Sequence, residues 1–474
     1  MTEALWTGDA LVAATGGRPA GRLPDAMTGI SIDTRSLKPG EAYFAIKGDT
    51  HDGHDFASAA MAAGAGAIVV AESKLAGLGR LTIPMVVVDD TLEALGNLGR
   101  AARARSTARI IAVTGSAGKT TTKEALRHAL SGLGRVHASD RSFNNHWGVP
   151  LTLARMPADT EFGIFEIGMN HAGEIRPLAG MVRPHVAIVT LIAAAHLGHF
   201  SSLEEIARAK AEIFEGIEPD GAALLNQDDP HFALLSRLAR KAGVKHVHGF
   251  GEHLKARYRL VSFENGASGS RLVARIGRQD VEAVLGSPGR HMAQNALAVL
   301  GAADLVGADI AAVAASLATL EPEKGRGKRH DLVLPQGKAL LIDESYNANP
   351  ASMRAAIGLL AGTHTRRNGR RIAVLGDMRE LGVHSGALHG ELANVIAEAG
   401  IDRVFLAGTE MATLAERLPS AVLAAHRATS DDLAPLVAAD LRAGDIVMVK
   451  SSNGMRFDRI VERLTTQFKR AGAA

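Results

Sequence analysis

The stretch that decides the fold is RIIAVTGSAGKTTTKEALRHALSGLG, residues 109–134. The apolar run RIIAV predicts a strand, and TTTKEALRHAL predicts a helix that stops at the following glycines. Between them, a glycine-rich loop would point its backbone N–H groups at a phosphate on the helix N-terminus, where the helix dipole adds to the attraction. The sequence therefore predicts a phosphate-binding loop in an α/β fold.

The loop is shorter than the usual P-loop, because Val113 stands where the first glycine of that pattern would be. In the P-loop interpretation, Lys119 neutralises the β and γ phosphates and the Thr120 hydroxyl binds magnesium. A glycine-rich turn with an incidental lysine is the alternative. The predicted nucleotide-binding residues of the loop are Gly115, Ser116, Ala117, Gly118, Lys119, Thr120 and Thr121.

Composition sets the class of protein. The chain has 474 residues, 46% of them hydrophobic and 22% charged, which suggests about three globular domains. No apolar run approaches the ~20 residues of a membrane span, and the N-terminus lacks a signal-peptide pattern, so we expect a cytoplasmic protein without membrane insertion. The absence of cysteine excludes disulfides, thiolate metal sites and cysteine nucleophiles.

Charge gives little support to a nucleic-acid partner. The formal net charge is +3, although residues 100–109 and 324–329 are locally basic. Only 4% of the residues are aromatic, which leaves few side chains to stack on bases. Solvated linker surfaces are the alternative explanation of the basic stretches, and we expect no nucleic acid to bind.

Apolar β-branched runs alternate with alanine-rich helical stretches along the whole chain, which predicts parallel sheets covered by helices. We place domain boundaries at the basic stretch near residue 106 and at the glycine-rich, charged stretch EPEKGRGKRH, residues 321–330. The expected domains are residues 1–106, 107–324 and 325–474. The second would be a parallel-sheet, ATPase-like domain and the third a Rossmann-like domain.

Acidic residues follow three of the predicted strands: Glu166, Asp343 and Asp377. Ligands of open parallel sheets collect at the carboxyl ends of the strands, although each acid could instead cap a helix. Glu166 is the best magnesium ligand, because its strand would share a sheet with the loop. After Asp343, Asn349 and Pro350 predict the start of a helix, which leaves Tyr346 and Asn347 available for a ligand.

Two further segments carry candidate binding residues. GRHMAQN places His291 and Asn295 on one helix face, either as a surface pair or as a binding pair. SFNNHWGVP, residues 142–150, lacks apolar periodicity and favours recognition by Asn144 and Asn145.

Lys210 lies on an apolar helical stripe, four residues after Ile206 and three before Ile213. Leu203, Phe214 and Ile217 extend this stripe, so the lysine should face inward. Burial would lower its pKa, and the neutral amine could capture carbon dioxide as a carbamate. The alternative is a side chain that lays its stem on the core and sends its amine to water.

Taken together, these motifs resemble the Mur ligases, the ATP-dependent amide-forming enzymes of bacterial cell-wall precursor synthesis. The family loop Thr-Gly-x-x-Gly-Lys-Thr matches residues 114–120 and accounts for the missing glycine. FNNHWGVP, FEIGMNHAGEI, DESYNANP and LGDMRELG are most similar to members that add D-alanyl-D-alanine to UDP-N-acetylmuramoyl-tripeptide. The resemblance covers the whole chain.

The resemblance also implies site residues. Residues 31–56 are similar to the segment that holds the UDP-sugar, which implies contacts from Thr34, Arg35, Ser36 and Lys47. Asn295, Arg326 and Asp343 would hold ATP from the side. The family motif Ala-Lys-x-Glu-Ile matches residues 209–213 and implies a carbamylated Lys210. Lys119, Glu166, His196 and Lys210 would be catalytic, and the implied magnesium ligands are Thr120, Glu166, His196 and Lys210.

The sequence departs from the family pattern at two places. In AAAHLGHF, residues 193–200, Gly198 stands where the family usually has an acid, while His196 is retained. Near the C-terminus, Lys450 is followed by two serines rather than by Gly-Ser.

The implied reaction phosphorylates the tripeptide carboxylate with ATP and then lets the amine of D-alanyl-D-alanine attack the acyl phosphate. We expect a monomer that binds ATP and Mg²⁺. A folate-type polyglutamate ligase is one alternative. A P-loop ATPase switch that makes no bond is the other.

Overall fold

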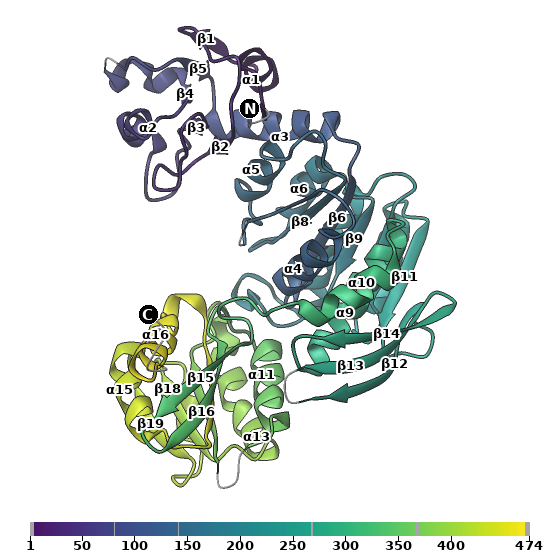
Figure 1. Cartoon of the computed structure of the whole chain (residues 1–474), viewed down its shortest axis with the longest axis vertical. Coiled ribbons are helices and arrows are strands. Elements are labelled where there is room, and N and C mark those ends of the chain that lie inside the picture. The colour runs from purple at the N-terminus through teal and green to yellow at the C-terminus, as the bar shows by residue number, and fades with distance from the viewer. Residues whose placement is uncertain (1–3, 80, 141, 267–268, 366–368, 470–474) are drawn as a thin grey trace.

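The computed structural model describes residues 4–79, 81–140, 142–266, 269–365 and 369–469. These residues form three β-sheets that follow one another along the long axis of the molecule, from the first at the top of Figure 1 to the third at the bottom. Each sheet has apolar side chains packed on both of its faces. The predicted α/β fold class is confirmed. No helix in the described part of the chain has the length and apolar character needed to cross a membrane.

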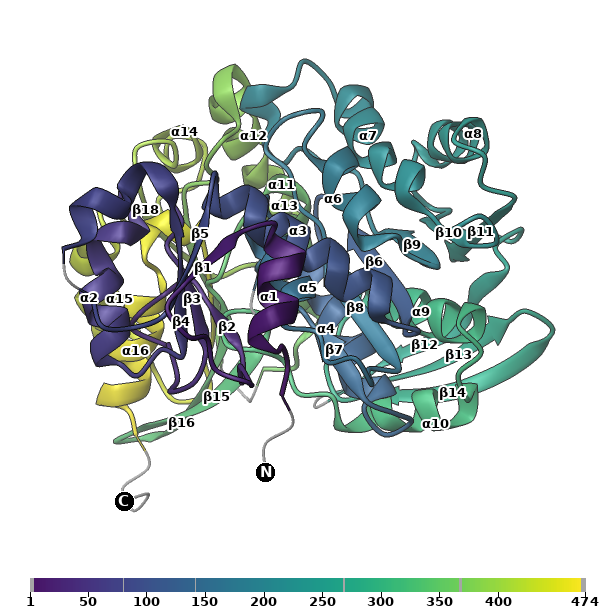
Figure 2. The same ribbon diagram turned by 90° about the horizontal axis from the view of Figure 1, so that it is seen from above.

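The first sheet has the order β1-β5-β4-β3-β2, and only the β1–β5 pair is antiparallel. Its strands are β1 (Arg18–Ala20), β2 (Ile30–Ser31), β3 (Ala42–Phe44), β4 (Ala67–Ala71) and β5 (Met85–Val88). Its helices are α1 (Gly8–Thr15), α2 (Ala57–Ala62) and α3 (Thr91–Arg105), with 3₁₀ turns η1 (Gly53–Phe56) and η2 (Glu72–Leu78). Helix α3 leads from this sheet into the central one (Figure 2).

The central sheet has the order β14-β13-β12-β11-β10-β9-β6-β8-β7. Its strands are β6 (Arg109–Thr114), β7 (Val136–Ala138), β8 (Phe162–Glu166), β9 (Val186–Val189), β10 (Ala222–Asn226), β11 (His246–Gly251), β12 (Tyr258–Asn265), β13 (Ser270–Ile276) and β14 (Gln279–Leu285). Its helices are α4 (Lys119–Leu130), α5 (Gly148–Ala154), α6 (Ile175–Val182), α7 (Leu203–Ala211), α8 (Phe232–Lys241), α9 (Arg290–Leu305) and α10 (Ile310–Ser316), with 3₁₀ turns η3 (Leu197–His199), η4 (Glu212–Gly216) and η5 (Leu317–Thr319).

The third sheet has the order β15-β16-β20-β17-β18-β19, and only β15–β16 is antiparallel. Its strands are β15 (Lys328–Leu334), β16 (Gly337–Glu344), β17 (Arg371–Gly376), β18 (Arg403–Ala407), β19 (Leu423–Arg427) and β20 (Ile446–Lys450). Its helices are α11 (Pro350–Gly362), α12 (Ser385–Gly390), α13 (Leu392–Glu398), α14 (Ala412–Ala415), α15 (Ser430–Asp440) and α16 (Asp458–Gln467), with 3₁₀ turns η6 (Gly382–His384) and η7 (Asn453–Met455). The predicted N-cap Asn349 and first helical residue Pro350 of α11 are confirmed.

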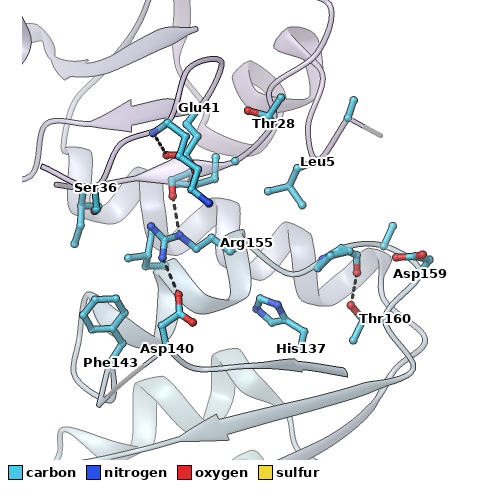
Figure 3. A pocket seen from close by; sticks show the side chains of 18 of the residues that line it. Leu5, Thr28, Ser36, Glu41, His137, Asp140, Phe143, Arg155, Asp159 and Thr160 are labelled. Atoms are coloured by element: carbon cyan, nitrogen blue, oxygen red, sulfur yellow. Dashed lines mark hydrogen bonds and ion pairs between the residues drawn. The ribbon is translucent and has the colours of Figure 1, made fainter. Parts of the chain in front are cut away.

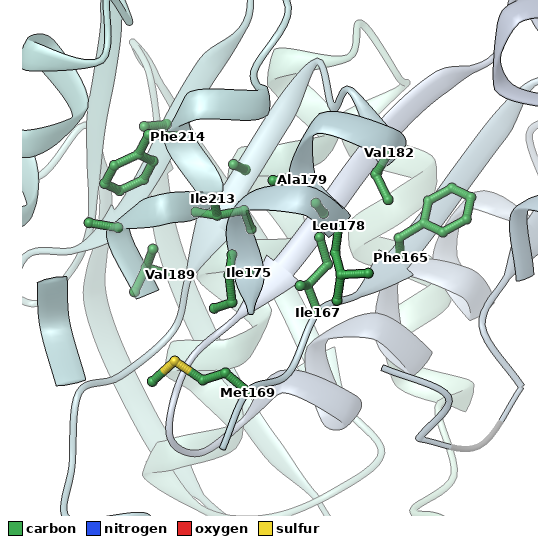
Figure 4. Close-up of a cluster of buried hydrophobic side chains, with 14 of the residues drawn as sticks. Phe165, Ile167, Met169, Ile175, Leu178, Ala179, Val182, Val189, Ile213 and Phe214 are labelled. Atoms are coloured by element: carbon green, nitrogen blue, oxygen red, sulfur yellow. The ribbon is translucent and has the colours of Figure 1, made fainter. Parts of the chain in front are cut away.

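Strand β6 lies at the centre of the core because its side chains alternate between two apolar layers. Ile110 and Ala112 join the layer under α6, η4 and α7, which Figure 4 shows around Ile213 and Phe214. Ile111 and Val113 join the layer under α4 and α9. Both faces of the strand are therefore covered, which explains its continuous apolar run.

Two features of the central sheet differ from the sequence prediction. Strands β12, β13 and β14 form an antiparallel extension instead of a parallel sheet. One face of this extension meets solvent, so the side chains of β13 alternate between buried and more exposed positions. The predicted helix through residues 202–217 ends at Ala211 and continues as the 3₁₀ turn η4. Leu203, which was expected on its apolar stripe, is 38% exposed because it is the first residue after the N-cap Ser202.

The buried guanidinium of Arg103 fastens α3 to the central sheet. Its Nε donates to the carbonyl of Val182 (2.8 Å) and its Nη2 to that of Arg183 (2.9 Å), beside the Glu218 carboxylate at 3.1 Å. We expect Arg103→Ala to cost about 2 to 4 kcal/mol, because it leaves two carbonyls without their donor and removes one of the two arginines that pair with Glu218. Thermal unfolding measures this loss. The exposed Arg100 of the same helix is the control, and equal melting temperatures for Arg103→Ala and Arg100→Ala would contradict the prediction.

Candidate active site

The loop between β6 and α4 is fixed to the end of strand β9. Gly115 has a φ of 150°, and a Cβ on it would lie 2.0 Å from the hydroxyl of Thr190. That hydroxyl donates to the carbonyl of Ala117 (2.5 Å), and the N–H of Ser116 donates to the carbonyl of Leu191 (2.7 Å). Only glycine at position 115 allows this close approach, and Gly118, with a φ of 84°, is the N-cap of α4.

A cavity of about 660 Å³ opens at this loop, between the carboxyl ends of the central strands and the third sheet. Strand register explains part of its lining, because Val113 of β6 pairs with Glu166 at the end of β8. Most residues predicted for the site line this one cavity: Ser116, Ala117, Gly118, Lys119, Thr120, Thr121, Asn144, Asn145, Glu166, His196, Asn295, Arg326, Tyr346 and Asn347.

Opposite charges meet in this cavity. The amine of Lys119 donates to the carbonyl of Gly115 (2.7 Å), and burial lowers its pKa while Glu166 acts in the opposite direction. Glu166 is 1% exposed, and its Oε1 accepts from the side-chain amide of Asn144 (2.7 Å). Its buried Oε2 has no hydrogen-bond partner in the described part of the chain. A buried carboxylate oxygen without a partner is costly, so a cation or proton donor belongs there.

Lys210 is buried on helix α7, at 2% exposure, and it is not among the described residues that line the cavity. Its side chain makes no hydrogen bond or ion pair to any other described residue. Burial lowers its pKa well below the ordinary value, and the charge of Lys119 acts in the same direction. Because the side chain as a whole is buried, its environment favours the neutral amine over the charged one.

The donor set fits a magnesium ion that arrives with a nucleotide. Within the described ranges, no three acidic or histidine side chains are grouped tightly enough to hold a metal by themselves. Thr120, Glu166 and His196 nevertheless line the same cavity, and one Glu166 oxygen is unsatisfied. Magnesium commonly takes one or two carboxylates and completes its shell with phosphate oxygens and water, which suits this arrangement.

His196 contacts the third sheet as well as the cavity. Its Nδ1 pairs with the carboxylate of Glu380, and the N–H of Gly198 donates to the Glu380 carbonyl (2.8 Å). Burial lowers the pKa of His196, whereas Glu380 raises it. The carboxylate of Glu380 therefore lies beside His196, although the family acid at position 198 is replaced by glycine. Sequence reasoning missed Glu380, although the motif LGDMRELG contains it.

Side chains from both the central and the third domains surround the loop, and two of the contacts join the domains. Asn295 lies beside Gly118, since a Cβ there would be 2.9 Å from its Oδ1. Arg326 stacks on the ring of Tyr346, with its Cζ 4.1 Å from the ring centroid. The hydroxyl of Tyr346 is 2.8 Å from Ser142 Oγ, and the amide of Asn349, the N-cap of α11, donates to the Ser116 carbonyl (3.1 Å).

Asp343 and Asn347 support the segments around them. Asp343 is fully buried, and its carboxylate accepts from the N–H of Gly325 (2.9 Å) and from the hydroxyl of Ser345 (2.6 Å). It thereby positions the linker that carries Arg326 and does not line the cavity. The carbonyl of Asn347 accepts from the Lys450 amine (2.9 Å).

The residues predicted for a UDP-sugar lie apart from this cavity. Arg35 and Ser36 line a second cavity of about 1320 Å³, between the first and central sheets (Figure 3). Arg35 is paired with Asp33 (2.7 Å), and Arg155 crosses the gap by donating to the carbonyl of Ile30 (2.7 Å). Thr34 and Lys47 line neither cavity.

Comparison with protein families matches all three parts of the chain. Residues 26–103 match the model described as Mur ligase family, catalytic domain. Residues 113–303 match the Mur ligase middle domain, and residues 325–453 match the Mur ligase, glutamate ligase domain.

Similar proteins agree with these matches. A UDP-N-acetylmuramoyl-tripeptide--D-alanyl-D-alanine ligase of Rickettsia prowazekii is 32% identical over 91% of this chain and 94% of its own length. The Escherichia coli protein of the same name is 37% identical over 80% of this chain and 81% of its own.

Among solved structures, MurF from Acinetobacter baumannii superposes with a TM-score of 0.84 at 30% identity, covering 97% of this chain and 99% of that one. MurF ligase from Thermotoga maritima in complex with ADP gives 0.77 at 25% identity, covering 93% and 98%. The chain belongs to the Mur ligase family.

The geometry of the loop predicts the effect of Gly115→Ala. The added Cβ would collide with the Thr190 hydroxyl and would strain a backbone that only glycine adopts easily. We expect ATP binding, measured by calorimetry, to weaken by about tenfold or more, since a 1.4 kcal/mol distortion suffices. Gly132, whose added Cβ would meet nothing within 4 Å, is the control. Unchanged ATP affinity in Gly115→Ala would mean that the loop does not hold the phosphates.

Proposed function

We propose that the protein is an ATP-dependent ligase that joins D-alanyl-D-alanine to UDP-N-acetylmuramoyl-tripeptide in peptidoglycan precursor synthesis. The observation that carries the proposal is the meeting of the phosphate loop, the unsatisfied Glu166 carboxylate and His196 at one interdomain cavity. The names of the similar proteins favour this substrate pair over a folate-type polyglutamate ligase or an ATPase switch.

In the proposed reaction, a tripeptide carboxylate oxygen attacks the γ-phosphorus of ATP and releases ADP. The amine of D-alanyl-D-alanine then attacks the acyl phosphate, and the tetrahedral intermediate loses inorganic phosphate and a proton as the amide forms. The protein must align the carboxylate with the γ-phosphate and balance the negative charge that gathers between them. Lys119 and the backbone N–H groups of Gly115 and of residues 117–119 would supply this balance, whereas the N–H of Ser116 already donates to the Leu191 carbonyl.

Thr120, Glu166 and His196 would hold Mg²⁺, which stabilises negative charge on phosphate oxygens when it is bound. We propose that Lys210 joins them as a carbamate: its neutral amine attacks carbon dioxide and releases a proton, which turns a cation into an oxygen ligand. The burial of the Lys210 side chain supports the step, because burial lowers the pKa of the amine and favours its uncharged form.

We propose a division of labour among domains 1–106, 107–324 and 325–474. The first would hold the UDP-sugar through Thr34, Arg35, Ser36 and Lys47, with Asn144 and Asn145 nearer the peptide. The second and third would close on ATP through Asn295, Arg326 and the linker held by Asp343. The amine acceptor would enter beside Tyr346 and Asn347. We propose a monomer that works in the cytoplasm, where ATP and UDP-linked precursors are made.

Phosphate release tests the proposed reaction. With ATP and Mg²⁺ alone we expect negligible release, because the tripeptide carboxylate is the phosphoryl acceptor. Release should need both UDP-N-acetylmuramoyl-tripeptide and D-alanyl-D-alanine, and Lys119→Ala should lower it by about a hundredfold or more while melting as the wild type does. Vigorous hydrolysis by the enzyme alone would favour the switch. Near-normal turnover of Lys119→Ala would refute the assigned role of the loop.

A carbamate on Lys210 can be detected directly. In ¹³C-bicarbonate, we expect a carbamate carbon signal in the NMR spectrum of the wild type and its loss in Lys210→Ala, together with most of the activity. Lys241, an exposed lysine of α8, is the control, and Lys241→Ala should keep both. If Lys210→Ala retained the carbamate signal or full ligase activity, Lys210 would not be the modified residue.

A further inference from the structure

One contact between the central and third sheets joins a predicted metal ligand to an acid that has no assigned role. The contact joins the 196–200 turn of the central domain, which follows β9, to the 377–384 segment of the third domain, which follows β17. The N–H of Gly198 donates to the Glu380 carbonyl (2.8 Å), and the Glu380 carboxylate pairs with Nδ1 of His196. Glu380 thus holds the 196–200 turn through both its backbone carbonyl and its side-chain carboxylate.

The backbone at this contact adopts a rare conformation on both sides. Four non-glycine residues in the described ranges have a left-handed φ, and two of them, His196 (59°) and Glu380 (64°), are the partners in this contact. Side chains disfavour this region, and such residues persist where the surrounding structure requires them, often at functional segments. The side chains of His196 and Glu380 therefore meet at the cost of an unfavourable backbone conformation in both residues.

Two glycines permit the close approach. A Cβ on Gly198 would lie 3.2 Å from both the Glu380 carbonyl oxygen and the Gly382 nitrogen. A Cβ on Gly382, whose φ is 57°, would lie 2.9 Å from the Cα of Gly198. A larger residue at either position would push the turns apart and carry the Glu380 carboxylate away from His196.

The chemistry of the pair follows from the imidazole. When Nδ1–H donates to a carboxylate, Nε2 keeps its lone pair and the ring plane is fixed, which is the usual arrangement of a histidine that binds a metal. We propose that Glu380 is the positioning residue of His196, so that docking of the 377–384 segment onto the 196–200 turn prepares His196 as a metal ligand. This inference rests on the proposed function, and it makes the third domain part of the magnesium site.

Manganese provides a readout that is independent of turnover. Mn²⁺ binding to the full chain, saturated with a non-hydrolysable ATP analogue, is measured by electron paramagnetic resonance. We expect Glu380→Ala to weaken Mn²⁺ binding by about tenfold or more. Glu380→Gln keeps a side-chain acceptor and should recover part of the loss. Glu398→Ala removes an exposed acid of α13 and should bind Mn²⁺ as the wild type does.

A double-mutant cycle separates positioning from a general structural effect. If Glu380 acts through His196, then Glu380→Ala should cause no further loss in a His196→Ala background. Gly198→Ala should weaken Mn²⁺ binding in the same direction, through the steric separation of the two turns. Wild-type Mn²⁺ affinity in Glu380→Ala, or losses that simply add in the double variant, would overturn the proposal.

The two proposals fail in different ways. A wild-type enzyme that binds Mn²⁺ through the coupled pair but forms no amide would refute the proposed reaction and leave the role of Glu380 intact. An active ligase in which Glu380→Ala leaves Mn²⁺ affinity unchanged would refute only the role of Glu380.

Discussion

The site depends on the withdrawal of three charged groups from water at one end of the central sheet. Glu166 and Lys210 are 1% and 2% exposed, and among the residues that the structure describes the amine of Lys119 has only a loop carbonyl as its hydrogen-bond partner. Desolvation disfavours each charge, and the protein does not pair them fully, since one Glu166 oxygen lacks a partner among the described residues. The arrangement therefore suits a ligand that brings phosphates, and this Glu166 oxygen suits the cation of the proposed reaction.

Sheet topology brings these groups together. Strand β6 lies between β9 and β8, so the phosphate loop is flanked by Thr190 on one side and Glu166 on the other. Both neighbours are parallel to β6, and their carboxyl ends reach the same edge. The close contact of Gly115 with Thr190 then fixes the loop against a strand rather than leaving it as a free turn.

Local sequence signals predicted the elements that carry the chemistry. The strand, loop and helix at residues 109–134, the N-cap Asn349 and the inward position of Lys210 each follow from a short-range pattern, and each has the predicted local structure. The antiparallel extension β12–β14 was not predicted. Alternating side chains indicate a strand with one solvent-exposed face, but they do not say which strand it pairs with or in which direction. Asp343 illustrates the same limit: its place at the end of strand β16 did not reveal that its carboxylate would hold the Gly325 linker.

Contacts between the domains could not be predicted from the sequence for a different reason. Ser142 with Tyr346, Ser116 with Asn349 and His196 with Glu380 join residues separated by 184 to 233 positions, and no periodicity relates them.

All three pairs lie where loops after parallel strands of one sheet meet the segments of the other. Because the central sheet supplies the phosphate loop and the third supplies Tyr346, Asn349 and Glu380, neither sheet alone surrounds the cavity. The position of the third domain is therefore itself a determinant of the site, and its contacts with the phosphate loop and with His196 can change together when that domain moves.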